Sequence, residues 1–183
     1  MNGFPALASL PRLARHLLAA FLLVAASGYT LGVFFVDHTT HMHPDGIAER
    51  YRGTEAMGVD PMSLPPDHEL QFEKTPAELL NITHTHMISL ALVFLAVGGV
   101  FLLASGIPAW LRATLVLEPF LSIILTFGGM YLLRYHSPAW SLLIAASGTL
   151  MTLCFYSMAA VSLWQLLRPA KSPRPELFPG GEE

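Results

Sequence analysis

The sequence predicts an all-α integral membrane protein, a four-helix bundle of antiparallel transmembrane helices with one long outer loop. Of its 183 residues, 53% are hydrophobic and only 13% are charged, which is too apolar for an ordinary soluble domain. Four stretches with at most one charged residue each are as long as the roughly 20 residues that a helix needs to cross a bilayer core. Short connections between the last three stretches require neighbouring helices to run antiparallel.

The first transmembrane helix is predicted over residues 12–36, after a cytoplasmic tail of residues 1–11. Two arginines precede its apolar part, and Ala25-Ala26-Ser27 resembles a signal-peptide cleavage site. However, the apolar part continues without a charge to Val36, beyond the roughly 7–15 residues of a signal peptide's hydrophobic region. We therefore interpret this segment as a retained membrane anchor.

Residues 37–75 are predicted to form a periplasmic loop rich in histidine, methionine and acidic residues. Its apolar content is too low for a separate core, so we expect it to lie over the helix ends. The second helix is predicted over residues 76–106. Thr75 and Glu78 match a capping box, in which the side chain of each residue binds the backbone of the other at a helix start.

The third and fourth transmembrane helices are predicted over residues 111–134 and 138–167. Ser137 before a proline is typical of a helix N-cap followed by the first helical residue. The proline-rich residues 168–183 are predicted to form a disordered cytoplasmic tail. Glu118 is the only charged residue between Arg112 and Arg134 in the third helix, where it either pairs with Arg112 near the inner surface or takes part in proton movement.

The distribution of Lys and Arg predicts which side of the membrane each end of the bundle faces. With both termini inside, the cytoplasmic segments contain six basic residues and the outer segments four, while the long loop is acidic. We therefore predict a multi-pass protein of the bacterial inner membrane, with cytoplasmic termini and a periplasmic loop. The inner basic residues are Arg12, Arg15, Arg112, Arg168, Lys171 and Arg174.

Histidines gather on the predicted outer face. Only His16 belongs to the opposite side. Imidazole is the commonest metal ligand, so this one-sided cluster predicts a metal or cofactor site at the outer face. The single cysteine excludes a disulfide within the chain and an attachment motif for c-type haem. The seven outer histidines are His38, His41, His43, His68, His84, His86 and His136.

Patterns of small residues predict which histidines face the bundle interior. His84 and Gly98 share one seven-residue repeat of the second helix, and Gly129 and His136 share another in the third. His84 and His86 are two positions apart, roughly 200° around a regular helix, so they do not point at one centre. We therefore predict that His84 faces inward and leave His86 to the loop, a second site or a partner.

One interpretation is a b-type haem held between helices near the outer face, because haem iron binds imidazole. His84 and His136 are then the axial ligands, and Arg134 is placed to pair with a propionate. The helix count and the histidine placement resemble four-helix membrane b-type cytochromes. This resemblance implies electron transfer or a role in a respiratory assembly. Expected partners are respiratory-complex subunits, a periplasmic electron carrier or a quinol.

A second interpretation is a copper or zinc centre. His38, His41 and His43 lie within six residues of each other, together with Met42. Imidazole suits copper and zinc, and a thioether selects Cu(I). Such a site is completed by histidines from other helices, namely His84 and His136, with His86 as an alternate. Asp37 and Asp45 are then placed to orient the imidazole rings. The function is then metal handling or cofactor insertion.

A third interpretation is a metal-free accessory or assembly subunit, whose histidines bind backbone and water at the headgroup boundary. No combination of nucleophile, base and orienting residue is evident, so we predict no independent catalytic activity. No phosphate-binding loop or basic patch points to a nucleotide or nucleic acid partner. The lipid bilayer is the partner common to all three interpretations.

Overall fold

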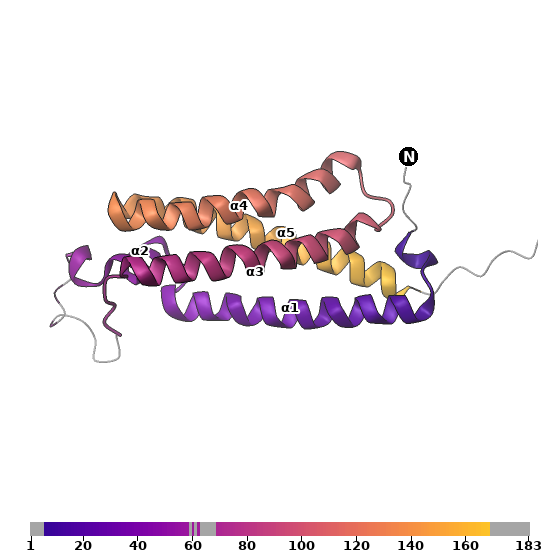
Figure 1. The fold of residues 1–183 in the computed structure, drawn as a ribbon, viewed down its shortest axis with the longest axis horizontal. Coiled ribbons are helices and arrows are strands. Elements are labelled where there is room, and N and C mark those ends of the chain that lie inside the picture. The colour runs from indigo at the N-terminus through magenta and orange to yellow at the C-terminus, as the bar shows by residue number, and fades with distance from the viewer. Residues whose placement is uncertain (1–5, 59, 61, 63–68, 169–183) are drawn as a thin grey trace, which may run out of the picture.

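The computed structural model describes residues 6–58, 60, 62 and 69–168 of the chain. Four long helices lie side by side along most of its length (Figure 1), and all four are long and apolar enough to cross a membrane. No strand occurs in the described residues. The four-helix bundle predicted from the sequence is therefore confirmed. The long helices are α1 (Arg12–Thr40), α3 (Pro76–Leu102), α4 (Ala109–Tyr135) and α5 (Ser141–Leu167).

The segment predicted as a loop over residues 37–75 contains more helix than expected. The helix α1 runs on through Thr40, because the hydroxyls of its last two threonines donate to carbonyls one turn earlier. A short helix, α2 (Pro44–Arg52), follows and buries Ile47 and Ala48 against the ends of the long helices. Single 3-10 turns complete the fold: η1 (Leu7–Ser9), η2 (Glu55–Met57) and η4 (Pro138–Trp140).

Hydrogen bonds fasten α2 and the chain that returns from it to the end of α4. Arg52 donates to the carbonyl of Leu133, and Arg134 donates to the carbonyl of Lys74. Arg134 also forms an ion pair with Glu73. The helix α2 and the returning chain therefore form a cap on this end of the bundle, as expected of a segment that lies over the helix ends.

The predicted helix starts are confirmed at α3 and before α5. Thr75 and Glu78 form both bonds of the capping box. The hydroxyl of Ser137 accepts the N–H of Ala139 at the start of η4, which leads directly into α5. These bonds satisfy backbone donors that the first turn of a helix otherwise leaves without a partner.

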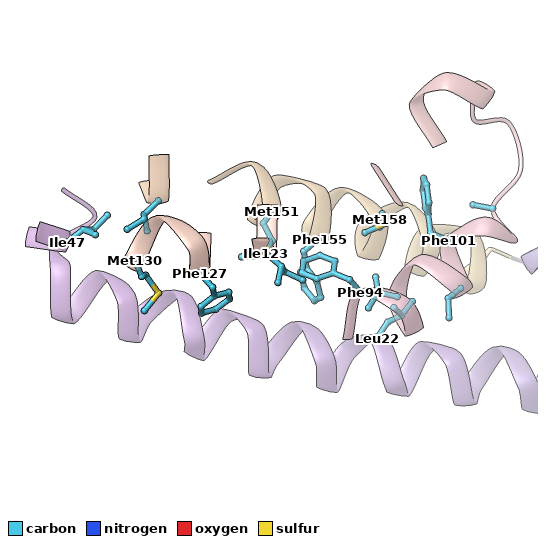
Figure 2. Packing of buried hydrophobic residues seen from close by; sticks show 14 of the residues in the cluster. Leu22, Ile47, Phe94, Phe101, Ile123, Phe127, Met130, Met151, Phe155 and Met158 are labelled. Carbon is cyan, nitrogen blue, oxygen red and sulfur yellow. The ribbon is translucent and has the colours of Figure 1, made fainter. Parts of the chain in front are cut away.

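The helix α5 lies at the centre of the bundle and packs against α1, α3 and α4. Its Phe155 is completely buried, with its ring stacked on Tyr29 of α1 at 4.0 Å between centroids and edge-on to Phe94 of α3 (Figure 2). Side chains from three helices thus meet around one aromatic ring, which fixes how these helices pack.

The helix α1 lies at the side of the bundle (Figure 1) and is fastened mainly to α5. Its Tyr29 hydroxyl is 3.2 Å from the Thr152 hydroxyl, and a neighbouring pair, Thr30 and Tyr156, is 2.7 Å apart. Gly28 and Gly32 have no neighbour within 4 Å of the position that a Cβ would occupy. These two glycines therefore do not form a packing seam within the chain.

Glu118 lies inside α4, and its carboxylate accepts the hydroxyl of Ser122 one turn later. Its other oxygen is buried without a hydrogen-bond partner. The expected pairing with Arg112 is wrong, because the Arg112 guanidinium donates to the carbonyl of Ala104 instead. The side chain of Arg112 is thus held by the α3–α4 turn and not by Glu118.

Candidate functional site

All described histidines are exposed, and six of them belong to the end of the bundle that carries the α2 cap (Figure 1). His16 lies near the opposite end of α1, and His68 is outside the described residues. No group of three or more His, Cys, Asp or Glu side chains in the described part of the chain is placed to hold a metal ion. The six histidines are His38, His41 and His43 around the α1–α2 junction, His84 and His86 in α3, and His136 at the end of α4.

The junction between α1 and α2, residues 38–45, is a tight turn that we call the histidine corner. His41 ends α1 with its backbone in the left-handed region, at φ 52°, and its N–H donates to the carbonyl of Asp37 at 2.7 Å. Met42 also has φ 52°. Non-glycine residues at positive φ are uncommon, and such strained conformations cluster at ligand sites. An imidazole residue and a thioether residue, consecutive in the chain, thus both have a strained backbone at the corner.

Gly46 allows α2 to start directly against the end of α1. A Cβ at this position would lie 2.1 Å from the carbonyl oxygen of Thr40, so only glycine fits. The same carbonyl accepts the N–H of His43 at 3.1 Å. The relative positions of the two helix ends, and of the histidines they carry, are thus determined by backbone contacts.

The ring of His43 is oriented by the first turn of α2. Its Nδ1 accepts the N–H of Asp45 at 3.3 Å and lies 3.4 Å from the Asp45 carboxylate, while the side chain is 66% exposed. A metal on Nε2 would move the ring proton to Nδ1, which would then exchange its bond from the Asp45 N–H for one to the Asp45 carboxylate. Carboxylates commonly orient metal-bound histidines through such a bond.

The structure does not turn His84 toward the bundle interior as predicted. Both α3 histidines are exposed, and it is His86 whose ring lies 5.8 Å from that of Phe127, a buried residue of α4. The Nδ1 of His86 is 2.9 Å from the carbonyl of Ile82. His84 lies on the same side of α3 as Ile88, which is also exposed.

His84 and His136 lie at different heights in the bundle. The contact between His86 and Phe127 fixes the relative level of the antiparallel helices α3 and α4. At about 1.5 Å per residue, His136 then lies ~10 Å farther toward the outer end than His84. Arg134, expected to bind a propionate, has its guanidinium engaged by Glu73 and by a backbone carbonyl. The three residues expected around a haem are therefore not assembled.

Comparison with known families gives one match, to a family described as a transmembrane helical domain (Aq_1264_TM), over residues 41–173. The chain belongs to this family. It is therefore a multi-pass membrane protein, in agreement with its four apolar helices. Neither the curated proteins nor the solved structures contain a match.

Proposed function

We propose that the chain is a multi-pass inner-membrane protein that binds copper at its periplasmic face and serves metal handling or cofactor insertion. Four exposed donors in six residues carry this proposal. His38 lies in the last turn of α1, and His41, Met42 and His43 follow in the corner. A thioether beside imidazoles is a ligand set that selects Cu(I).

Zinc fits the corner less well than copper. Zinc sites are usually tetrahedral, with His, Cys, Asp or Glu ligands. The thioether of Met42 is a soft donor that zinc does not prefer. Cu(I) is bound well by two imidazoles and a thioether, so the corner favours copper.

Haem also fits less well, for three reasons. His84, one of the two proposed axial ligands, is exposed on a side of α3 where Ile88 is also exposed. The guanidinium of Arg134 is already engaged by Glu73. In addition, the α3 histidine nearest to α4 is His86, which contacts Phe127 rather than a second imidazole.

The charges of the described residues support a periplasmic corner. Apart from Glu118, the acidic residues of the described part belong to the end that carries the corner. The positive-inside rule counts Lys and Arg. The sequence assigns six of them to the side of both termini and four to the side of the corner, so the rule makes the corner side periplasmic. Membrane sidedness is testable by labelling a cysteine placed at Ala56 with an impermeant maleimide, in a background with Cys154→Ser.

The copper site is tested by titrating the purified, metal-free protein with Cu(I) in the presence of a competing chelator. We expect one copper per chain for the native protein. Affinity should fall at least tenfold in Met42→Leu and be lost in the triple variant His38→Ala/His41→Ala/His43→Ala. His16→Ala is the matched control, because this exposed histidine lies at the other end of α1, and its copper binding should be unchanged.

Other results would overturn the copper proposal. Copper binding that survives in the triple variant would place the metal elsewhere. A purified protein with an intense Soret band that disappears in His84→Ala or His136→Ala would support haem. A colourless protein that binds no metal but copurifies with a respiratory enzyme would support the metal-free accessory role.

A further inference from the structure

A cavity of about 430 Å³ opens at the end of the bundle opposite the histidine corner. It lies between the α3–α4 turn and the last turns of α5, with Ala8 from the N-terminal 3-10 turn at its edge. Ser105, Gln165 and Arg168 give it polar groups, and Trp164, Ile107 and Val161 give it an apolar wall. The cavity is thus amphipathic and sits where the transmembrane helices end.

The rim of this cavity is held in place by hydrogen bonds. The Gln165 side chain accepts the N–H of Ser105 and donates to its carbonyl, both at 2.9 Å. Arg112 donates to the carbonyl of Ala104 at 2.8 Å. The N–H of Leu7 donates to the carbonyl of Leu103 at 3.0 Å, and its side chain is completely buried. The α3–α4 turn is therefore fixed relative to α5 without a ligand.

Arg168 supplies a charge that the described part of the chain leaves uncompensated. Its guanidinium stacks on the ring of Trp164 at 3.3 Å from the centroid, and within the described ranges it has no ion pair. Three further arginines, Arg12, Arg15 and Arg112, belong to the same end of the bundle. No acidic residue of the described segments accompanies them there.

We propose that this cavity binds the headgroup of an anionic phospholipid. Arg168 is the cation for its phosphate, and Ile107 and Val161 contact the glycerol and upper acyl chains. Tryptophan is enriched at the level of membrane headgroups, where Trp164 lies in a bundle that spans a bilayer. Basic pockets between transmembrane helices are known binding sites for anionic lipid headgroups. This site is independent of the copper proposal.

Trp164 provides a fluorescent probe of the site. The chain has three tryptophans, so Trp110→Phe/Trp140→Phe leaves Trp164 alone. This variant is reconstituted into phosphatidylcholine vesicles that contain a small fraction of brominated lipid, with either a phosphatidylglycerol or a phosphatidylcholine headgroup. We expect the brominated phosphatidylglycerol to quench Trp164 at a mole fraction at least threefold lower than the brominated phosphatidylcholine.

Variants of two arginines separate a specific site from general attraction to a charged surface. Arg168→Gln should abolish the preference for phosphatidylglycerol, and Arg168→Lys, which keeps the charge, should retain most of it. Arg12→Gln is the matched control, because it removes a charge at the same end without lining the cavity. Its preference for phosphatidylglycerol should remain.

Several outcomes would refute the lipid site. Equal quenching by the two lipids would remove the headgroup preference. If the preference for phosphatidylglycerol survives in Arg168→Gln, it does not come from this cavity. If Arg12→Gln reduces the preference as much as Arg168→Gln does, it comes from the charge of the whole surface. Protection of Trp164 from lipid quenching by inorganic phosphate at millimolar concentration would identify a soluble anion as the ligand instead.

Discussion

Replacement of Gly46 by alanine tests the corner on which the copper proposal rests. The new Cβ would lie 2.1 Å from the carbonyl oxygen of Thr40, whereas ordinary contacts begin at 3.4 Å, so α1 and α2 must separate by about 1.3 Å. That movement breaks the 3.1 Å hydrogen bond from His43 to the same carbonyl. Steric overpacking costs typically 1–3 kcal/mol and a lost hydrogen bond about 1 kcal/mol.

Alanine also favours a helix over glycine by about 1 kcal/mol, which offsets part of this cost at Gly46. The net loss in the free energy of unfolding is therefore about 1–3 kcal/mol. For a chain of this size that corresponds to a melting temperature roughly 2–12 °C lower. Thermal unfolding in detergent, followed by intrinsic fluorescence, measures this change. Gly28→Ala is the matched control, because no atom lies within 4 Å of its Cβ position and no loss is expected.

Copper affinity of the Gly46→Ala protein gives a second, more local readout. Movement of α2 carries His43 away from His41, and metal–ligand distances tolerate only about 0.2 Å. We expect the affinity for Cu(I) to fall at least tenfold, while Gly28→Ala binds copper normally. An unchanged melting temperature would show that the close approach of the two helices is wrong. A lower melting temperature with unchanged copper affinity would show that copper does not bind at the corner.

Two further predictions concern the α2 cap. Burial raises the pKa of Tyr51 above its ordinary value of 10.0, so the folded chain keeps this phenol neutral where the unfolded chain ionises it. Stability should be constant below about pH 10 and fall above it, and Tyr51→Phe should reduce that fall in unfolding measured against pH. Arg134→Gln and Glu73→Gln should show a coupling of about 0.5–1 kcal/mol in a double-mutant cycle, smaller at high salt. Additive effects of the two substitutions would contradict the ion pair.

The number of spans and the helix starts were predictable because the signals for them are local. A stretch without charges is apolar whatever surrounds it, and the capping box at Thr75 needs only residues within one turn. The α2 helix was also predictable from the sequence. We predict a loop over residues 37–75, although Pro44 at the first helical position and Asp45 in the first turn are equally typical of a helix start.

The partners of the candidate site residues were not predictable, because they depend on contacts between distant segments. The approach of His86 rather than His84 to α4 depends on how the two helices pack, which the pattern of small residues on α3 does not predict. The ion pair of Arg134 with Glu73 depends on where the returning chain crosses the end of α4. Glycine is required at position 46 because a Cβ there would clash with the end of another helix, and the spacing of residues in the sequence does not indicate such a contact.

The attachment of α1 to α5 has a consequence for biosynthesis. The helix α1 leaves the ribosome before α5, on which its hydrogen-bonding partners Thr152 and Tyr156 lie. At ~5–20 residues per second, α1 waits roughly 6–25 s in the bilayer before α5 is complete. During that interval Tyr29 and Thr30 lack these partners, so α1 is fastened into the bundle only after α5 has been made.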